Sequence, residues 1–317
     1  MLLTRFMAGM VPFAIVMMGA SVACGQAYPD KPVRILTPGP GGTADFTARL
    51  ASPVLAARLG QPVFVENRPA VLVTETVQKA APDGYTLQLG GATMWLAPLF
   101  QKTSYDPLRD FVPITLTTSA PNILVIHPSL PVTTVRQLIT LARARPGDLN
   151  YASGGTGSSP HLASELFNSM AGIKIVRVNY KGTAPGLTAL MAGEVQVMFA
   201  TSGATSHVKS GKLRALAVTS AKPSALFPGS PVLAATLPGY ESASLVGMFA
   251  PANTPAAIIN RLNQEFVQIL NQPEMKEKLF NTGVEVVASS SQELAATIKS
   301  DMARMGKVIK DAGIRAE

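Results

Sequence analysis

Two glycine-rich turns contain the residues of this sequence that are best suited to hold a small anion. Residues 38–43 read Pro-Gly-Pro-Gly-Gly-Thr, and residues 153–160 read Ser-Gly-Gly-Thr-Gly-Ser-Ser-Pro. Glycine lets the backbone approach a ligand closely, and the first turn of a helix carries unpaired amides with a partial positive charge. Each turn precedes a segment of helical periodicity, so together they could grip one anion from both sides. Ordinary strand-to-helix connections have the same composition, and the residues alone leave both interpretations open.

The first turn also fits a second kind of chemistry. Gly39, Gly41 and Ala44 have the spacing of a dinucleotide-binding fingerprint, and Glu66 closes the next expected strand, where it could bind a ribose hydroxyl. This alternative would make the chain an exported oxidoreductase. The two prolines of the turn speak against it, because they stiffen the backbone and remove amide donors that a pyrophosphate needs.

Other catalytic chemistry has little support in the sequence. His127, His161 and His207 lie far apart, without the paired spacing of metal ligands, so we expect neither a metal nor a cofactor. His161 directly follows the second turn and fits either a ligand contact or a polar residue at a helix start. Ser158 lacks the strand–turn pattern around a nucleophile elbow. We therefore expect no catalytic residue and no enzyme.

The charge balance does not indicate a nucleic-acid partner. The chain has 317 residues, of which 27 are Lys or Arg and 19 are Asp or Glu, which gives a formal net charge of +8. The basic residues are scattered, and Trp95 is the only tryptophan, so no stripe of aromatic and basic residues exists for bases to stack on. The length itself suggests two domains or one large one.

Residues 1–27 have the layout of a secretory signal. A basic residue, Arg5, precedes an apolar run, and Gly25-Gln26-Ala27 offers small residues for cleavage before Tyr28. The single cysteine, Cys24, lies inside this segment, so cleavage after Ala27 leaves a chain without a thiol. Cleavage before Cys24 with lipid anchoring, and an uncleaved membrane anchor, are the alternatives. No later segment has a comparable apolar run.

The rest of the chain alternates between strand and helix patterns, which predicts an α/β fold with mostly parallel sheets. Apolar residues at helical spacing predict a helix over 44–59 that stops at Gly60. Two amphipathic helices are predicted near the end of the chain, at about 255–271 and 292–311. Strands are expected at 33–36, 63–65, 85–89, 123–126 and 149–152, and further helices at 135–145 and 161–170. The segments 175–178, 187–191, 195–199 and 213–218 continue the alternation.

A series of motifs, in order along the chain, resembles one family. It comprises residues 28–34 (YPDKPVR), 41–45 (GGTAD), 60–69 (GQPVFVENRP), 79–86 (KAAPDGYT), 149–154 (LNYASG), 157–163 (GSSPHLA), 180–185 (YKGTAP), 211–220 (GKLRALAVTS) and 249–251 (FAP). Together these motifs are similar to those of the Bug family, the extracytoplasmic solute receptors of tripartite tricarboxylate transporters.

The resemblance implies a two-domain periplasmic binding protein of the Venus-flytrap form. One domain would contain 28–123 and 247–317, the other 124–246, and two strands would cross the hinge between them. Such a receptor is expected to be a periplasmic monomer that closes on a small carboxylate or related polar metabolite. It would deliver the ligand to a two-subunit membrane permease or act in sensing.

The resemblance also implies where the ligand binds, and its carboxylate contacts fall on the same two glycine-rich turns. Asp45 is expected to bind a polar group of the ligand, order a water or cap the helix, and Trp95 either lines the pocket or packs in the core. The full set of expected ligand-binding residues is Pro40, Gly41, Gly42, Thr43, Asp45, Thr93, Ser153, Gly154, Thr156, Gly157, Ser158, Ser159, His161, Ala200 and Thr201.

The sequence departs from the family pattern at three places. Gly39 stands where the family usually has an aromatic residue, and the first turn is about one residue shorter. Residues 70–73 (AVLV) replace a glycine-rich loop. Gln196 and Ala200 stand where relatives often have aspartates near the second wall of the cleft. A roomier and less acidic pocket is expected, which favours a larger or more apolar carboxylate over acidic amino acids.

Overall fold

The computed structural model describes residues 28–39, 42–180 and 182–315. The predicted signal segment 1–27 with Cys24, and the turn residues Pro40 and Gly41, lie outside the described residues. No helix among the described residues is long and apolar enough to cross a membrane.

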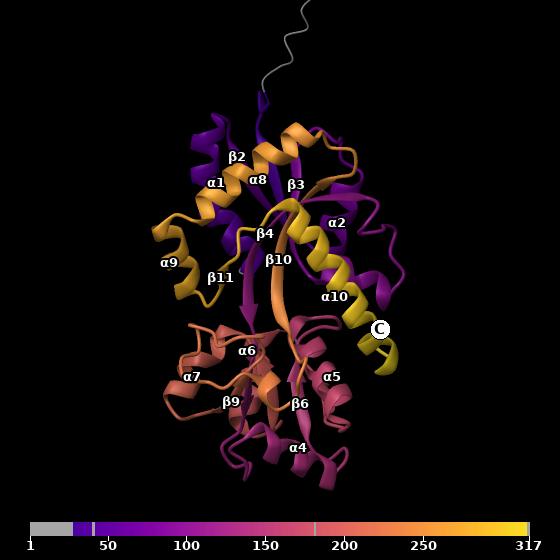
Figure 1. Cartoon of the computed structure of the whole chain (residues 1–317), viewed down its shortest axis with the longest axis vertical. Helices are drawn as coiled ribbons and strands as arrows, with labels where there is room; N and C mark the ends of the chain where they lie inside the picture. The colour runs from indigo at the N-terminus through magenta and orange to yellow at the C-terminus, as the bar shows by residue number, and fades with distance from the viewer. Residues whose placement is uncertain (1–27, 40–41, 181, 316–317) are drawn as a thin grey trace, which may run out of the picture.

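Two β-sheets lie one above the other along the long axis of the molecule, and helices flank both (Figure 1). The six-stranded sheet has the order β11-β4-β10-β3-β1-β2, and the five-stranded sheet has the order β7-β6-β8-β5-β9. The strands are β1 (Val33–Pro38), β2 (Val63–Arg68), β3 (Thr86–Gly91), β4 (Phe111–Pro121), β5 (Ile123–Ile126), β6 (Asn150–Ser153), β7 (Val176–Asn179), β8 (Val197–Ala200), β9 (Arg214–Val218), β10 (Ala243–Pro251) and β11 (Glu285–Val286).

Most longer helices begin and end close to where the periodicity predicts them, but four helices are not among the predicted segments. Two of these are α2, which starts directly after Pro69, and α9, which starts at a proline; the other two are the short helices α3 and α7. The helices are α1 (Thr43–Leu59), α2 (Ala70–Gln78), α3 (Thr93–Leu96), α4 (Val135–Ala144), α5 (Ser159–Ala171), α6 (Thr183–Ala192), α7 (Thr205–Lys209), α8 (Ala256–Leu270), α9 (Pro273–Asn281) and α10 (Ser291–Asp311), with 3-10 turns at Ala97–Leu99, Ser202–Ala204 and Leu233–Ala235.

Alternation along the strands builds a core on each face of both sheets, because successive side chains of a strand point to opposite faces. In β1, Ile35 packs with the residues of α1 and α8, whereas Leu36 packs with those of α2 and α3. In β5, Leu124 faces the core formed with α4 and α5, and Val125 faces the core formed with α6. Covering both faces leaves the strand ends as the places where loops can meet a ligand.

The predicted α/β class is confirmed, but the prediction of mostly parallel sheets is wrong in detail. Among the described strands, β1 pairs parallel with β2 and β3, and β6 pairs parallel with β7 and β8. The pairings of β10 with β3 and β4, of β4 with β11, and of β5 with β8 and β9 are antiparallel. The strand–helix–strand units give the parallel pairs, and the strands that connect the two sheets give antiparallel ones.

Two stretches of chain connect the sheets. β4 ends at Pro121 and β5 begins at Ile123, so only Asn122 lies between the two sheets, and residues 219–242 lead back from β9 to β10. Asn122 is fully buried, and its amide donates to Thr219 Oγ1 at 2.7 Å while its carbonyl accepts from the Thr219 amide at 2.9 Å. The two connections are therefore bonded to each other where they pass between the sheets.

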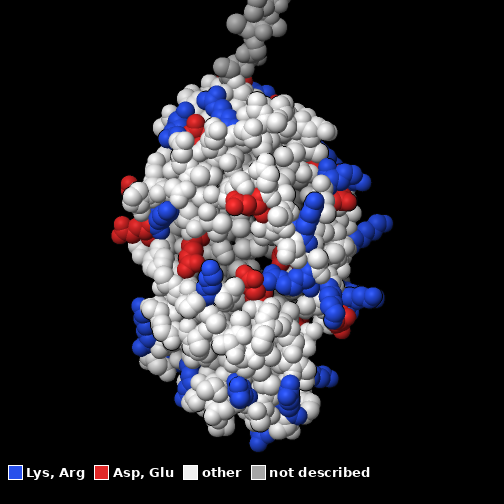
Figure 2. All heavy atoms as spheres, viewed as in Figure 1, with Lys and Arg blue, Asp and Glu red and all other residues white. Residues whose placement is uncertain are grey.

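Charged side chains are spread over the surface. On the face in Figure 2, lysines and arginines lie in separate groups over both halves and do not form one continuous patch.

Candidate functional site

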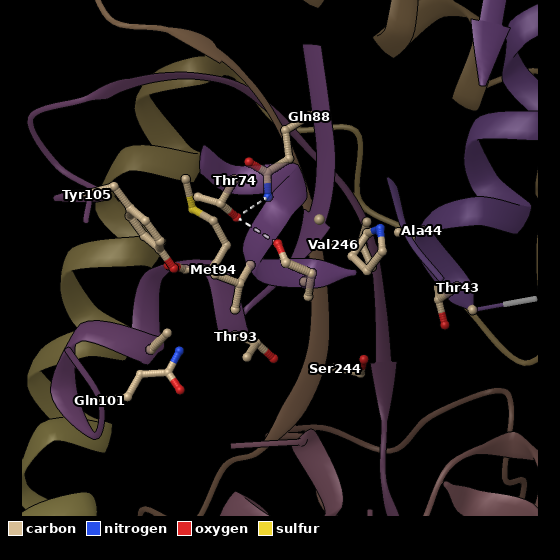
Figure 3. A pocket seen from close by; sticks show the side chains of 17 residues that line it. Thr43, Ala44, Thr74, Gln88, Thr93, Met94, Gln101, Tyr105, Ser244 and Val246 are labelled. Atoms are coloured by element: carbon tan, nitrogen blue, oxygen red, sulfur yellow. Dashed lines mark hydrogen bonds between the residues drawn. The ribbon is translucent and has the colours of Figure 1, made fainter. Parts of the chain in front are cut away.

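A cavity of about 240 Å³ opens at the carboxyl ends of β1 and β3, where the first glycine-rich turn leads into α1 (Figure 3). In open α/β sheets this is the end of the strands at which ligands bind. Its apolar lining includes Val71, Met94 and Val246, and its polar lining includes Thr43 and Thr93. The cavity therefore has an apolar body, with hydroxyl groups near the helix starts.

The start of α1 presents unpaired amides to this cavity. Gly42 is the N-cap residue, and no side chain caps the helix. The first bond of the helix runs from the Phe46 amide to the Gly42 carbonyl at 2.9 Å. Among the described residues, the amides of Gly42, Thr43 and Ala44 have no acceptor, and all three residues line the cavity. An anion is the natural partner for such a helix start.

Asp45 lies in the same helical turn but does not line this cavity. Its carboxylate is 4% exposed, forms an ion pair with Arg49 Nε at 2.9 Å and accepts from Asn67 Nδ2 at 2.8 Å. Asn67 Nδ2 also donates to Thr37 Oγ1 at 2.7 Å. The structure thus places Asp45 where it joins α1 to β1 and β2.

The second turn lines a different, smaller cavity of about 80 Å³, to which no described residue of the first turn contributes. Gly157 and Ser159 line this cavity from the second turn, and Thr93 and Ser244 line both cavities. Gly157 has a φ of +77°, and a Cβ there would lie 2.4 Å from Cζ of Phe100. The glycine is needed because Phe100, which follows the 3-10 turn at Ala97–Leu99, packs directly against this backbone.

His161 holds the second turn from inside. The ring is 3% exposed, and Nδ1 accepts from the Gly157 amide at 3.1 Å. Burial, with the positive charge of Arg177 as the smaller cause, lowers the pKa of His161 to about 4. A neutral ring at neutral pH can accept this bond, so the placement favours the structural interpretation of His161 over a direct ligand contact.

Serine hydroxyls occupy the start of α5. Ser158 Oγ is buried and has no partner among the described residues, although Ser158 is the N-cap residue. Ser159 Oγ accepts from Asn122 Nδ2 at 2.9 Å. Asn122 thereby bonds the second turn to the connection between the sheets. Ser158 itself lines neither of the two cavities.

Arg177 was not anticipated from the sequence, yet it bonds most of the polar atoms at the start of the second turn. Its guanidinium donates to Ser153 Oγ at 2.8 Å, Thr156 Oγ1 at 3.1 Å and the Gly154 carbonyl at 2.8 Å. Within the described part of the chain, the amides of Gly155 and Thr156 have no acceptor. The hydroxyls of Ser153 and Thr156 are therefore engaged, whereas the amides of Gly155 and Thr156 have no acceptor among the described residues.

Gln88 is a second polar residue that the motifs did not indicate. It is 1% exposed at the inner end of the larger cavity, and its Nε2 donates to Thr74 Oγ1 at 3.0 Å (Figure 3). Gln88 Oε1 is buried without a partner in the described residues. One signal could have revealed it, because Gln88 interrupts the apolar run of the expected strand 85–89.

The remaining expected site residues are placed as follows. Ala200 is fully buried at the carboxyl end of β8, followed by Thr201, and neither lines the two cavities.

The placement of Gln196 at the second wall is wrong. Gln196 precedes β8, and its Oε1 accepts from the amide of Asn150 at 3.0 Å, at the opposite end of β6 from Ser153. Because Gln196 directly precedes β8, its closeness to Ala200 in the sequence does not show that the two residues lie at opposite ends of the strand.

Trp95 packs in the core. It is fully buried, its Nε1 donates to Asp301 Oδ2 of α10 at 2.9 Å, and its ring centroid lies 6.0 Å from that of Phe249. The alternative in which Trp95 lines the pocket is therefore wrong, because neither cavity includes it.

Two features are relevant to enzyme chemistry, namely the surroundings of Glu66 and clusters of metal-ligating side chains. Glu66, the residue considered for a ribose hydroxyl, pairs with Arg68 at 2.6 Å and lies 4.0 Å from Arg34 Nη1. Across the described ranges, no group of three or more His, Cys, Asp and Glu residues could hold a metal ion.

Comparisons with known proteins agree on one family. Residues 47–314 match the family described as tripartite tricarboxylate transporter family receptor. The chain is 32% identical over 305 residues to protein BugT of Bordetella pertussis, a match that covers 93% of this chain and 94% of that one. R. palustris Rpa4515 with adipate is 35% identical with a TM-score of 0.79, over 92% of this chain and 100% of that one. The periplasmic binding protein BugD is 28% identical with a TM-score of 0.76, over 92% and 100%.

The depressed pKa of His161 predicts a specific pH dependence of stability. In the unfolded chain His161 binds a proton below about pH 6.5, whereas in the folded chain it stays neutral until about pH 4. The free energy of unfolding should therefore fall by up to about 3 kcal/mol as the pH drops through this window. His161→Gln should lack this part of the decline when urea unfolding is measured between pH 7 and pH 4.5.

His207→Gln on α7 is the matched control and should decline as the wild type does, because it keeps His161. Equal pH slopes for His161→Gln and the wild type would show that the His161 ring is not held neutral by the fold.

Proposed function

The chain belongs to the tripartite tricarboxylate transporter receptor family, and we propose that it captures an elongated carboxylate between its two glycine-rich turns. The observation that carries the proposal is the pair of helix starts, α1 and α5, whose turns carry amides without acceptors among the described residues. Both turns line cavities that share Thr93 and Ser244. Family membership confirms the resemblance in the motifs, and a solute-binding receptor replaces the dinucleotide-dependent oxidoreductase as the function of this fold.

Backbone amides supply the attraction for the carboxylate. Each helix start carries a partial positive charge, and a carboxylate that accepts from several amides forms charge-assisted hydrogen bonds. The hydroxyls of Thr43, which lines the larger cavity, and of Ser158, which is buried without a partner among the described residues, add a donor from each turn. Of the described residues that line the larger cavity, none is a lysine or an arginine.

The larger cavity indicates the shape of the rest of the ligand. Its lining is mainly apolar, and no Asp or Glu of the described chain contributes to it. An ammonium group buried there would lack a counter-charge, and burying an unpaired charge is costly. Rpa4515, a similar protein, was solved with adipate, whose two carboxylates are separated by a chain of methylene groups. We therefore propose a carboxylate with an apolar middle rather than an acidic amino acid.

Closure of two domains explains how binding becomes a signal. We assign 28–123 and 247–317 to one domain and 124–246 to the other, with β4 and β10 as the strands that cross between them. A ligand that contacts both turns gains contacts only when the domains approach, so it stabilises the closed form over the open one. The closed form then presents a surface that a membrane permease can distinguish.

The same proposal includes the cellular location, the oligomeric state and the partner of the receptor. We propose that residues 1–27 direct the chain to the periplasm and are removed, and that the mature protein is a monomer. Its partner would be a two-subunit permease, or a sensory protein where no permease is present. The proposed activity is binding without chemical conversion of the ligand, as expected of a solute receptor.

Isothermal titration with a panel of carboxylates tests the proposed function. The panel contains straight-chain monocarboxylates, dicarboxylates from succinate to suberate, benzoate, aspartate and glutamate. Dicarboxylates with several methylene groups should bind best, and the acidic amino acids should bind at least about tenfold more weakly because their ammonium group is unpaired in the cavity. A preference for glutamate or aspartate would overturn the ligand class, and no binding of any carboxylate would overturn the function.

Removing one hydroxyl from each turn tests whether both turns hold the ligand. Thr43→Val and Ser158→Ala should each weaken the affinity for the best carboxylate by about 1–3 kcal/mol, the loss expected for a hydrogen bond to a charged group. Ser158→Ala should keep or raise the melting temperature of the free protein, because the hydroxyl it removes is buried without a partner among the described residues.

Thr188→Val on the exposed side of α6 is the matched control and should leave the affinity unchanged. Affinities equal to the wild type in both test variants would show that the ligand lies elsewhere in the fold.

A further inference from the structure

The guanidinium of Arg177 forms four hydrogen bonds around the second glycine-rich turn. Three reach the turn itself, at Ser153 Oγ, Thr156 Oγ1 and the Gly154 carbonyl, and the fourth reaches Asn179 Oδ1 at 3.2 Å. All four acceptors are neutral. No carboxylate among the described residues lies within ion-pair distance of this guanidinium. The arginine thus directs its hydrogen bonds to neutral groups of the loop and to Asn179.

The strand register explains why Arg177 can reach the turn. β7 runs parallel to β6, with Arg177 opposite Tyr151 and Asn179 opposite Ser153. Side chains two residues apart on a strand share a face of the sheet, so these four side chains project together toward α5. The long arginine side chain extends along this face from the edge strand to the turn that follows β6.

These bonds fix which atoms of the turn remain for a ligand. The hydroxyls of Ser153 and Thr156 are already acceptors for the guanidinium. The Gly154 carbonyl points at Arg177, and because a trans peptide directs its C=O and N–H to opposite sides, the Gly155 amide points away from it. The amides of Gly155 and Thr156 have no acceptor within the described ranges.

We infer that Arg177 is the positioning residue of the second carboxylate-binding turn: its forked hydrogen bonds to residues 153–156 orient the backbone amides that receive the ligand, and it does so without touching the ligand. This inference rests on the proposed function, and it reassigns Ser153 and Thr156 from ligand contacts to supports of the turn. A planar fork with several donors suits this task, whereas a lysine offers only a point charge.

The test compares Arg177→Gln and Arg177→Lys with the matched control Arg214→Gln. Arg214 is a half-buried arginine of the same sheet that donates to the Val132 carbonyl at 2.8 Å, so its replacement removes the same charge and a similar carbonyl bond away from the turn. Isothermal titration uses adipate as the probe. Both Arg177 variants should bind adipate about tenfold or more weakly, the loss expected when charged hydrogen bonds that order a site are removed, and Arg214→Gln should bind as the wild type does.

Two NMR readouts on the free protein separate positioning from general stability. The backbone order parameters of Gly155 and Thr156 should fall in both Arg177 variants and stay unchanged in Arg214→Gln. The titration of His161, whose pKa Arg177 helps to lower, should move upward in Arg177→Gln but stay low in Arg177→Lys, because lysine keeps the charge and loses the fork.

Equal adipate affinities in Arg177→Gln and Arg214→Gln would overturn the inference, and so would full affinity in Arg177→Lys, since charge alone would then suffice. If the wild type binds no carboxylate, the proposed function fails. The order parameters of Gly155 and Thr156 still decide whether Arg177 orders the turn, so the two failures remain distinguishable.

Discussion

The proposed site depends on backbone amides at the starts of α1 and α5 that have no acceptor among the described residues. A helix cannot pair its first N–H groups internally, and here glycine-rich turns in place of capping side chains keep several of them open within the described chain. Because the two helices flank different sheets, an anion that satisfied both sets would have to lie between them. In the proposed function, the ligand would thus add a bond between the two halves of the molecule.

The surrounding residues keep these amides in place. On the first side, Asp45 joins α1 to β2 through Asn67. On the second side, Arg177 bonds the turn from the sheet, and His161 bonds it from within the helix. Each of these polar residues bonds the backbone or joins elements next to a turn. The mainly apolar lining of the larger cavity is the basis for the ligand class proposed above.

Hydrophobic periodicity and turn composition were enough to predict most strands and helices and the two glycine-rich turns. They could not predict α2. Residues 70–73 stand where the family pattern has a glycine-rich loop, and the helix that they begin is stabilised by the burial of Val73 and Val77. Motif position placed Asp45 near the ligand, but the direction of its side chain follows from Arg49 and Asn67. Trp95 likewise could not be assigned until α10, far along the sequence, brought Asp301 to its indole.

Small-angle X-ray scattering of the mature protein, with and without the carboxylate that binds best, tests the central claim most directly. A ligand held by the amides of both helix starts draws the two sheets together, so the radius of gyration should fall on saturation and follow the same titration curve as binding. A carboxylate that binds tightly while the radius of gyration stays constant would contradict the account, since the ligand would then be held by one turn alone.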